Sequence, residues 1–314
     1  MLPALDKNAK AVLITGVTGK QGGATINSLI DSGALATYKL LAVTRDTNSS
    51  AARELAARGV TLIQGDLSDC HALFHTAMIL LASENRSRSI WGVFSVQALS
   101  KKEEEQGKAL VDAAVANKVE FFVYTSVDRG GEDRSPQNPT NVPHFSSKHR
   151  IETYLLAAAR KSHMNWTILR PVCFMENLSL GKGFEAKVMG TAWRIGLGSK
   201  PLQLVATSDI GWYAAQALLH PDIYSGRSIS IAGDELSFAQ ANGLFKAQSG
   251  QDIPQTMPIL ARLIMWLAGD LGAMINWFSV EGYKADITSL RQEHPQLLSF
   301  EAWLIGSGWV KKAK

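Results

Sequence analysis

The stretch that decides the fold runs from residue 11 to residue 30 and reads AVLITGVTGKQGGATINSLI. It begins with the apolar run AVLI (11–14), which has the length and β-branched content of a buried parallel strand. A glycine-rich turn follows, and beyond it Ile26, Leu29 and Ile30 recur at helical spacing. Strand, glycine turn and helix in this order predict a unit that binds phosphate groups.

The glycines of this turn have the spacing G-x-x-G-x-x-G. Gly16 can adopt the backbone angles of a tight turn, and Gly22 lets the helix pack closely on the strand. Gly19 removes a Cβ where a pyrophosphate would lie, and the free N–H groups at the helix start then face the anion. The alternative is a glycine-rich turn that binds nothing, which the clear strand and helix on either side disfavour.

Composition restricts the class of protein. The sequence has 314 residues, of which 46% are hydrophobic and 19% charged, enough for a large buried core. The net charge of +4 comes without a basic cluster, since Lys101-Lys102 is followed at once by Glu103-Glu104-Glu105, so we expect no nucleic-acid partner. Cys70 and Cys173 indicate free thiols in a reducing compartment. No secretory signal and no membrane-spanning run of about 20 apolar residues is evident, so a cytoplasmic protein without a membrane partner is expected.

Strand and helix patterns alternate along the first half of the sequence. Strands are predicted at 11–14, 39–44, 60–64, 90–96, 121–124 and 166–170, and two later strands at 202–205 and 228–231. This order predicts an α/β fold, a Rossmann-like doubly wound parallel sheet with a smaller, mostly helical C-terminal lobe. We place a nucleotide-binding Rossmann domain at 1–175. The lobe for substrate or partner is placed at 176–314, interleaved with late strands of the first domain.

The second half is irregular and aromatic, with six of the eight tryptophans at residue 193 or later. Such a lobe could close over an apolar ligand, although most of these aromatics are expected to be core. Residues 130–143 are expected to be a loop, and residues 146–161 and 258–278 to be helices.

Residues at the strand ends suggest the cofactor. Arg45 follows the second strand, where an arginine accommodates the 2′-phosphate of NADP and an acidic residue would favour NAD. Asp46, one residue later, is the feature that argues against NADP. Asp66 closes the third strand, where it either lies near an adenine or caps the next helix. Gln97, after the fourth strand, would face the same crevice.

Together these features resemble the NmrA-like family, a branch of the atypical short-chain dehydrogenase/reductase superfamily. The resemblance rests on TGVTGKQG (15–22), Arg45, Gly65-Asp66, FFVYTSV (121–127), HFSSK (144–148) and LRPVCFMEN (169–177). It implies a Rossmann domain and NADP(H) binding. It also implies that the phosphates are held by Gly16, Thr18, Gly19, Gln21, Gly22 and Arg45. Asp66 and Leu67 would flank the adenine, and the ribose and nicotinamide would be approached by Val96, Gln97, Lys148, Val172 and Phe174.

The resemblance leaves the activity open. Short-chain dehydrogenase chemistry uses a tyrosine as acid and a lysine four residues later, which holds the ribose and lowers the tyrosine pKa. Here Lys148 is present, but His144 occupies the tyrosine position. A histidine can donate a proton near neutral pH, although a surface histidine in a polar loop is an equal alternative.

The leading interpretation is an NADP(H)-dependent oxidoreductase acting on an apolar or aromatic carbonyl, enone or quinone, with Lys148 and His144 as catalytic residues. The alternative is a non-catalytic NADP(H)-sensing regulator that binds a protein partner. The aromatic lobe favours the enzyme, and the missing tyrosine favours the sensor.

Overall fold

The computed structural model describes residues 9–84, 89–178 and 183–307. Contacts divide the protein into two compact units. Unit 1 takes in the described residues of 1–126, 147–169 and 210–229. Unit 2 takes in the described residues of 127–146, 170–209 and 230–314.

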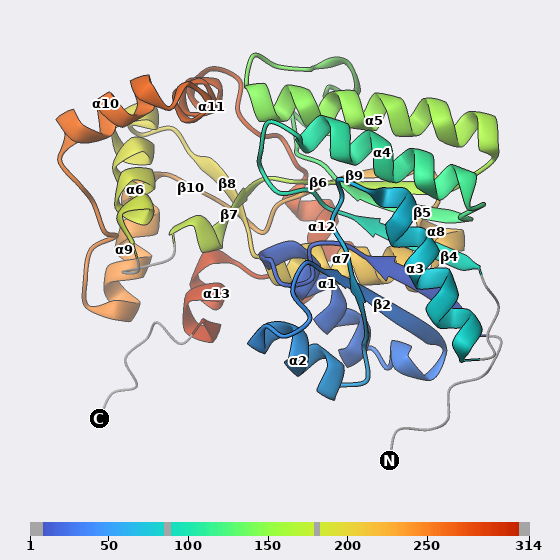
Figure 1. Ribbon diagram of the computed structural model, residues 1–314. Coiled ribbons are helices and arrows are strands. Elements are labelled where there is room, and N and C mark those ends of the chain that lie inside the picture. The colour runs from blue at the N-terminus through green and yellow to red at the C-terminus, as the bar shows by residue number, and fades with distance from the viewer. Residues whose placement is uncertain (1–8, 85–88, 179–182, 308–314) are drawn as a thin grey trace. The chain divides into compact units, whose positions relative to one another are not determined.

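A seven-stranded sheet has the order β3-β2-β1-β4-β5-β6-β9 (Figure 1). Its strands are β1 (Lys10–Ile14), β2 (Tyr38–Thr44), β3 (Thr61–Gln64), β4 (Ile90–Ser95), β5 (Phe121–Thr125), β6 (Asn165–Pro171) and β9 (Arg227–Ile231). Each pair from β3 to β6 is parallel. The strand order reverses between β1 and β4, which is where ligands bind in open α/β sheets. The predicted Rossmann-like doubly wound sheet is confirmed.

Helices cover both faces of this sheet. They are α1 (Lys20–Asp31), α2 (Ser50–Ala57), α3 (Cys70–Ser83), α4 (Glu103–Ala116), α5 (Pro143–Ser162), α7 (Thr207–Leu219) and α8 (Pro221–Tyr224), with the short 3₁₀ turn η1 (Ala34–Ala36). The 3₁₀ turn η2 (Ser135–Gln137) belongs to unit 2. On one face, buried Phe74 of α3, Leu110 of α4 and Ile151 of α5 share a core with Phe122 of β5. On the other face, a Cβ added to Gly92 of β4 would lie 3.5 Å from Leu218 of α7. Burial on both faces explains why the strands are continuous apolar runs.

Unit 2 contains a three-stranded sheet of order β10-β8-β7. Its strands are β7 (Cys173–Phe174), β8 (Leu202–Val205) and β10 (Asp234–Leu236), and β8 runs parallel to β7 and antiparallel to β10. Its helices are α6 (Phe184–Leu197), α9 (Phe238–Ser249), α10 (Pro258–Leu267), α11 (Gly269–Val280), α12 (Ile287–Glu293) and α13 (Phe300–Gly306), with the 3₁₀ turn η3 (Met175–Leu178). The expected helical C-terminal region is therefore confirmed.

Two predicted helices differ from the structure. The single helix expected at 258–278 is two helices, α10 and α11, which meet at an angle of 109°. Within the described ranges, no single helix is long and apolar enough to cross a membrane, although this bent pair reaches that length together. The helix expected at 146–161 begins earlier, at Pro143, because proline is well tolerated in the first turn of a helix. His144 consequently lies in the first turn of α5 and not in a loop.

Candidate functional site

The glycine turn after β1 is built by close backbone approaches. Gly16 has φ +65°, and a Cβ added to it would lie 2.5 Å from Cγ1 of Val96. A Cβ at Gly22 would lie 2.4 Å from both atoms of the Gly16 carbonyl and from the carbonyl oxygen of Thr15. Gly16 therefore makes the tight turn, and Gly22 allows α1 to lie directly against it.

The start of α1 is arranged for an anion. Gly19 is the N-cap in an extended conformation and provides no side-chain cap, so it does not satisfy the first N–H groups of the helix. A Cβ there would already lie 3.2 Å from the carbonyl oxygen of Gly16. Thr18 lies exposed in the turn. The side chain of Gln21 is held by the hydroxyl of Thr125, which donates to its Oε1.

Charged residues follow β2 and β3. Arg45 and Asp66 are both exposed. The backbone N–H of Ser68 donates to Oδ1 of Asp66 at 2.9 Å, and this bond is the largest cause lowering the pKa of Asp66, with the Arg45 charge contributing. Oδ1 of Asp46 accepts a hydrogen bond from the backbone N–H of Asn48 at 2.8 Å. This carboxylate oxygen is therefore used within the local turn. An exposed arginine therefore follows β2, at the position predicted from the sequence to distinguish NADP from NAD.

Helix α3 is capped by Asp69 and not by Asp66. Oδ1 of Asp69, the N-cap residue, accepts the N–H of Ala72 at 2.9 Å. The alternative role that the sequence allows for Asp66 therefore belongs to Asp69. Leu67, between them, is half-buried and packs against the core under α3.

The end of β4 is joined to the end of β1. The N–H of Val96 donates to the Thr15 hydroxyl at 2.8 Å. Gln97 is only 5% exposed, and its Nε2 donates to Ser95 Oγ at 2.9 Å. Its Oε1 is buried and has no hydrogen-bond partner among the described residues. A buried acceptor without a donor fits a site that is completed by a bound group, such as a ribose hydroxyl.

Lys148 lies in the part of α5 that belongs to unit 1. Its Nζ is 2.8 Å from Oε1 of Glu103, and the two side chains are 13% and 2% exposed. Sequence reasoning missed this pair, because Glu103 is one member of a run of three glutamates and nothing local distinguishes it from its neighbours.

Three predicted residues lie in unit 2. The N–H of Val172 donates to the carbonyl oxygen of Ile231 at 3.2 Å, and Phe174 pairs with Val205 between β7 and β8. His144 Nδ1 is 2.6 Å from Oδ2 of Asp270. The other predicted cofactor residues all lie in unit 1, at or after the ends of β1 to β4 or in α1 and α5.

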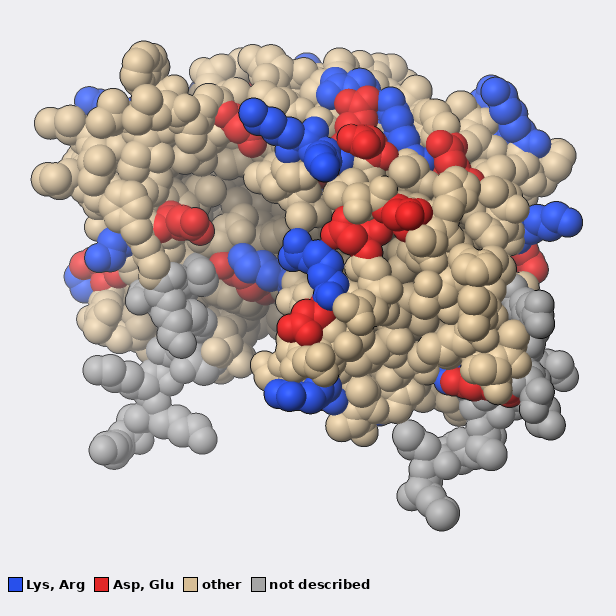
Figure 2. Space-filling view, in the orientation of Figure 1, with Lys and Arg blue, Asp and Glu red and all other residues tan. Residues whose placement is uncertain are grey.

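The residues of unit 1 fit a dinucleotide. Gly16 and Gly22 leave space that a Cβ would fill, and the start of α1 offers N–H groups. Oε1 of Gln97 adds a buried acceptor that a ligand donor could satisfy. Acidic and basic side chains are interspersed on the face that Figure 2 shows. Among the ion pairs of unit 1, Glu104 lies 2.6 Å from both Lys108 and Arg150.

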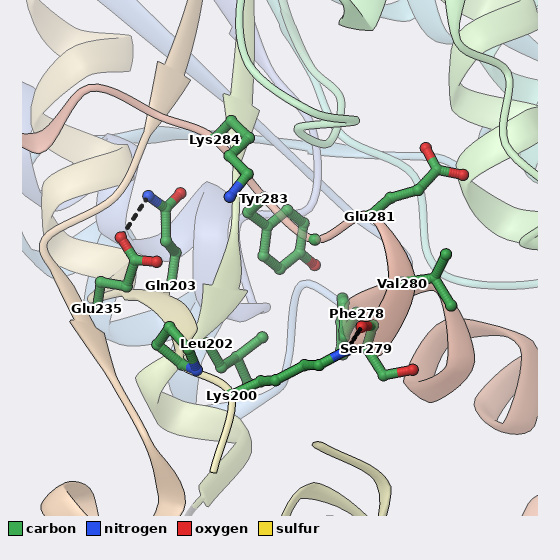
Figure 3. Close-up of a pocket in the computed structure, with 12 residues that line it drawn as sticks. Lys200, Leu202, Gln203, Glu235, Phe278, Ser279, Val280, Glu281, Tyr283 and Lys284 are labelled. Carbon is green, nitrogen blue, oxygen red and sulfur yellow. Dashed lines mark hydrogen bonds between the residues drawn. The ribbon is translucent and has the colours of Figure 1, made fainter. Parts of the chain in front are cut away.

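A pocket of about 260 Å³ lies within unit 2, between the ends of β8 and β10 and the segment after α11 (Figure 3). Gln203 Nε2 donates to Oε2 of Glu235 at 3.3 Å, and Lys200 Nζ donates to the carbonyl oxygen of Ser279 at 2.5 Å. Lys284 and Tyr283 also line the pocket, as do Leu202, Phe278, Val280 and Glu281. The lining includes none of the predicted site residues, and the pocket is smaller than the ~300–1,000 Å³ typical of ligand sites.

Solved structures share this fold. The NADPH-dependent quinone oxidoreductase QOR2 of Escherichia coli, solved with NADPH, has a TM-score of 0.71 at 22% identity, covering 94% of the present sequence and 99% of its own. NmrA, a negative transcriptional regulator solved with NADP, has a TM-score of 0.66 at 18% identity, covering 94% of each protein.

Sequence relatives are consistent with the fold. The NmrA-like family domain-containing oxidoreductase ptmS of Penicillium ochrochloron is 27% identical over 189 residues, 59% of the present sequence and 53% of that protein. The present sequence thus spans about half the length of this relative. The NAD(P)H azoreductase of Xenophilus azovorans is 25% identical over 244 residues, 77% of the present sequence and 75% of that protein. The profile of the NmrA-like family matches residues 8–302, nearly the whole sequence, and the protein therefore belongs to the NmrA-like family.

Proposed function

We propose that the protein is an NADP(H)-dependent oxidoreductase that reduces an apolar or aromatic carbonyl, enone or quinone. The observation that carries this proposal is the edge of the unit 1 sheet, where the glycine turn, the exposed Arg45 and the buried Gln97 acceptor follow neighbouring strands. Relatives named as oxidoreductases and an azoreductase support the reaction class. Unit 1 is then the cofactor domain, and unit 2 is the lobe that binds substrate.

The residues that would hold NADP(H) have distinct tasks. The backbone N–H groups at the start of α1 bind the pyrophosphate, and Arg45 binds the 2′-phosphate through its fork of donors. The remaining contacts to phosphate, adenine, ribose and nicotinamide fall to Gly16, Thr18, Gly19, Gln21, Gly22, Asp66, Leu67, Val96, Gln97, Lys148, Val172 and Phe174. When bound, NADPH supplies a hydride.

Reduction of a carbonyl needs a proton at oxygen as well as a hydride at carbon. We assign the proton to Nε2 of His144, whose Nδ1 lies 2.6 Å from Oδ2 of Asp270 and whose side chain is 16% exposed. The Nε2–H bond breaks as the O–H bond of the alcohol forms, which leaves a neutral imidazole that takes up a proton from solvent. A quinone can instead take its protons from water, so this substrate class depends less on His144.

A second candidate function is an NADP(H)-sensing regulator. The specific observation in its favour is that His144 stands four residues before Lys148, where the catalytic tyrosine of short-chain dehydrogenases would stand. NmrA, with the same fold, is described as a negative transcriptional regulator. A regulator needs the cofactor residues of unit 1 but no proton donor.

The experiment that tests the proposal is NADPH oxidation with a panel of aromatic ketones, enones and quinones, together with calorimetric NADPH binding. We expect turnover with at least one substrate. Lys148→Ala should lower both NADPH affinity and rate, whereas Lys161→Ala, an exposed lysine on the same helix, should change neither. NADPH binding without turnover of any substrate would favour the regulator, and absence of NADPH binding would refute both functions.

A further inference from the structure

Helix α10 of unit 2 carries a group of exposed apolar side chains. Eleven large apolar side chains are exposed among the described residues, and five of them lie between residues 257 and 267. They are Met257 (69% exposed), Ile259 (81%), Leu263 (49%), Trp266 (77%) and Leu267 (68%). Single exposed apolar residues are common on protein surfaces, whereas a continuous group of them marks a contact surface.

These side chains form one side of the helix. Consecutive residues of an α-helix are ~100° apart, so the four apolar residues from Ile259 to Leu267 fall within an arc of about 100°. Arg262, which is also exposed, lies at one edge of this arc. We call these five residues, together with Met257, the α10 face.

The α10 face is not the side that attaches the helix to unit 2. Ala261, on the opposite side, is 0% exposed. A Cβ added to Gly272 of α11 would lie 2.4 Å from the carbonyl oxygen of Met265, so α10 and α11 are in close contact at the corner between them. Because the helix is packed through these residues, the α10 face is available to a partner.

Of the two helices in the bent pair, only α10 offers such a surface. In α11, Ile275, Trp277 and Phe278 are at most 4% exposed, so these side chains belong to the core of unit 2. Helix α10 has 10 residues and is about 15 Å long, half the ~30 Å thickness of the hydrocarbon core of a bilayer. It is long enough to lie on a membrane surface and too short to cross one.

The size of the α10 face favours a lipid surface over a protein. A stable protein interface takes ~800 Å² from each partner, more than one convex side of a helix about 15 Å long and ~10 Å wide supplies. A second copy of the protein, docked through the same short helix, meets the same limit.

The charge and residue types of the α10 face fit anionic headgroups. Arg262 is the only charged residue between residues 253 and 269, so no carboxylate of this segment opposes an anionic surface. The surface over α10 is accordingly mostly uncharged in the view of Figure 2. The indole of Trp266 suits the boundary between headgroups and acyl chains, and the stem of Arg262 can lie along apolar surface while its guanidinium binds a phosphate.

We propose that the α10 face is a peripheral membrane-binding surface: its apolar side chains insert at the boundary between headgroups and acyl chains of an anionic bilayer, and Arg262 binds a lipid phosphate. This inference goes beyond the proposed function and does not depend on it, because it concerns only side chains of α10. It revises the sequence-based expectation of no membrane partner, which rested on the lack of a membrane-spanning run.

The first test is sedimentation of the full-length protein with vesicles of phosphatidylcholine, with and without phosphatidylserine. We expect binding that is stronger with phosphatidylserine. Ile259→Ser should lower the partition coefficient by about tenfold, from the lost burial of one apolar side chain. Arg262→Gln should lower it by about fivefold on vesicles that contain phosphatidylserine. The matched control is Ile79→Ser, the same substitution at an apolar residue of α3 that is 57% exposed, and it should bind as the wild type does.

The second test is tryptophan fluorescence. Adding vesicles should shift the emission of the wild type to shorter wavelength, and Trp266→Phe should remove this shift while most of the binding remains. Both side chains changed in the first test are exposed, so the urea midpoints of those variants should stay at the wild-type value.

Absence of binding to either kind of vesicle would overturn the proposal, as would equal binding by Ile259→Ser and Ile79→Ser or a shift that survives in Trp266→Phe. A dimer in analytical ultracentrifugation that Ile259→Ser abolishes, found in place of vesicle binding, would overturn it in favour of a second copy. Neither test uses NADPH or a substrate, so its outcome is distinct from that of the proposed function.

Discussion

A methyl group added at Gly22 tests the glycine turn most directly. In Gly22→Ala the new Cβ would lie 2.4 Å from three backbone atoms, both atoms of the Gly16 carbonyl and the carbonyl oxygen of Thr15, which would have to retreat by about 0.6 Å to reach even 3.0 Å. Within a helix, alanine is more favourable than glycine by up to ~1 kcal/mol. Overpacking lowers stability by ~1–3 kcal/mol. The cost here lies at the upper end of that range, because all three crowded atoms belong to the backbone and not to a flexible side chain. We expect a net loss of about 1–2 kcal/mol in the free energy of unfolding. A similar displacement of the turn should weaken NADPH binding by about tenfold or more.

The neighbouring residue provides the matched control. A Cβ at Gly23 would lie 3.2 Å from a single atom, the carbonyl oxygen of Val17, so Gly23→Ala should stay within ~0.5 kcal/mol of the wild type or be slightly stabilised. Urea unfolding, followed by fluorescence, and calorimetric titration with NADPH measure both effects. Equal stability and equal NADPH affinity in the two alanine variants would refute the argument that α1 packs on the turn through Gly22.

Three further predictions concern the cofactor, Lys148 and a thiol. Arg45→Ala should weaken NADPH binding by about 10- to 100-fold, from the loss of a charge-assisted contact, and leave NADH nearly unchanged; calorimetry showing equal wild-type affinities for the two dinucleotides would contradict it. Glu103→Gln removes the buried charge 2.8 Å from Lys148 and should lower the free energy of unfolding by about 1–3 kcal/mol, and an unshifted urea midpoint would argue against this. Burial raises the pKa of the Cys70 thiol from 9.0 to about 11, so alkylation of the native protein at pH 8 should be about a hundredfold slower than in urea. Because the folded pKa is raised, the stability that this thiol contributes is present below pH 9 and lost as pH rises towards 11; equal alkylation rates in both states would disprove the shift.

The sequence predicts those parts of the structure that depend on neighbouring residues. The strand, turn and helix around Gly16 and Gly22 are local, and their periodicity and glycine spacing indicate them directly. The parallel sheet follows from the alternation of strands and helices. In the three-stranded sheet of unit 2, β8 was predicted at 202–205, but its partners were not, because β7 has only two residues and β10 only three, too short to show a period. The single helix expected at 258–278 was wrong, since apolar residues continue across the break and conceal the bend between α10 and α11.

The two candidate functions, reductase and regulator, differ in the residues that each needs. The cofactor residues of unit 1 serve an NADP-dependent reductase and an NADP-responsive regulator equally, as the NADPH complex of the quinone oxidoreductase and the NADP complex of NmrA illustrate. What a reductase of carbonyls or enones needs in addition is a group that delivers a proton. The group proposed here is His144, four residues before Lys148. A regulator needs no proton donor, whereas the proposed reductase of carbonyls or enones would depend on one. A loss of turnover in His144→Ala would therefore favour the carbonyl or enone reductase, turnover that survives it would leave the quinone reductase, and variants of the glycine turn act on enzyme and sensor alike.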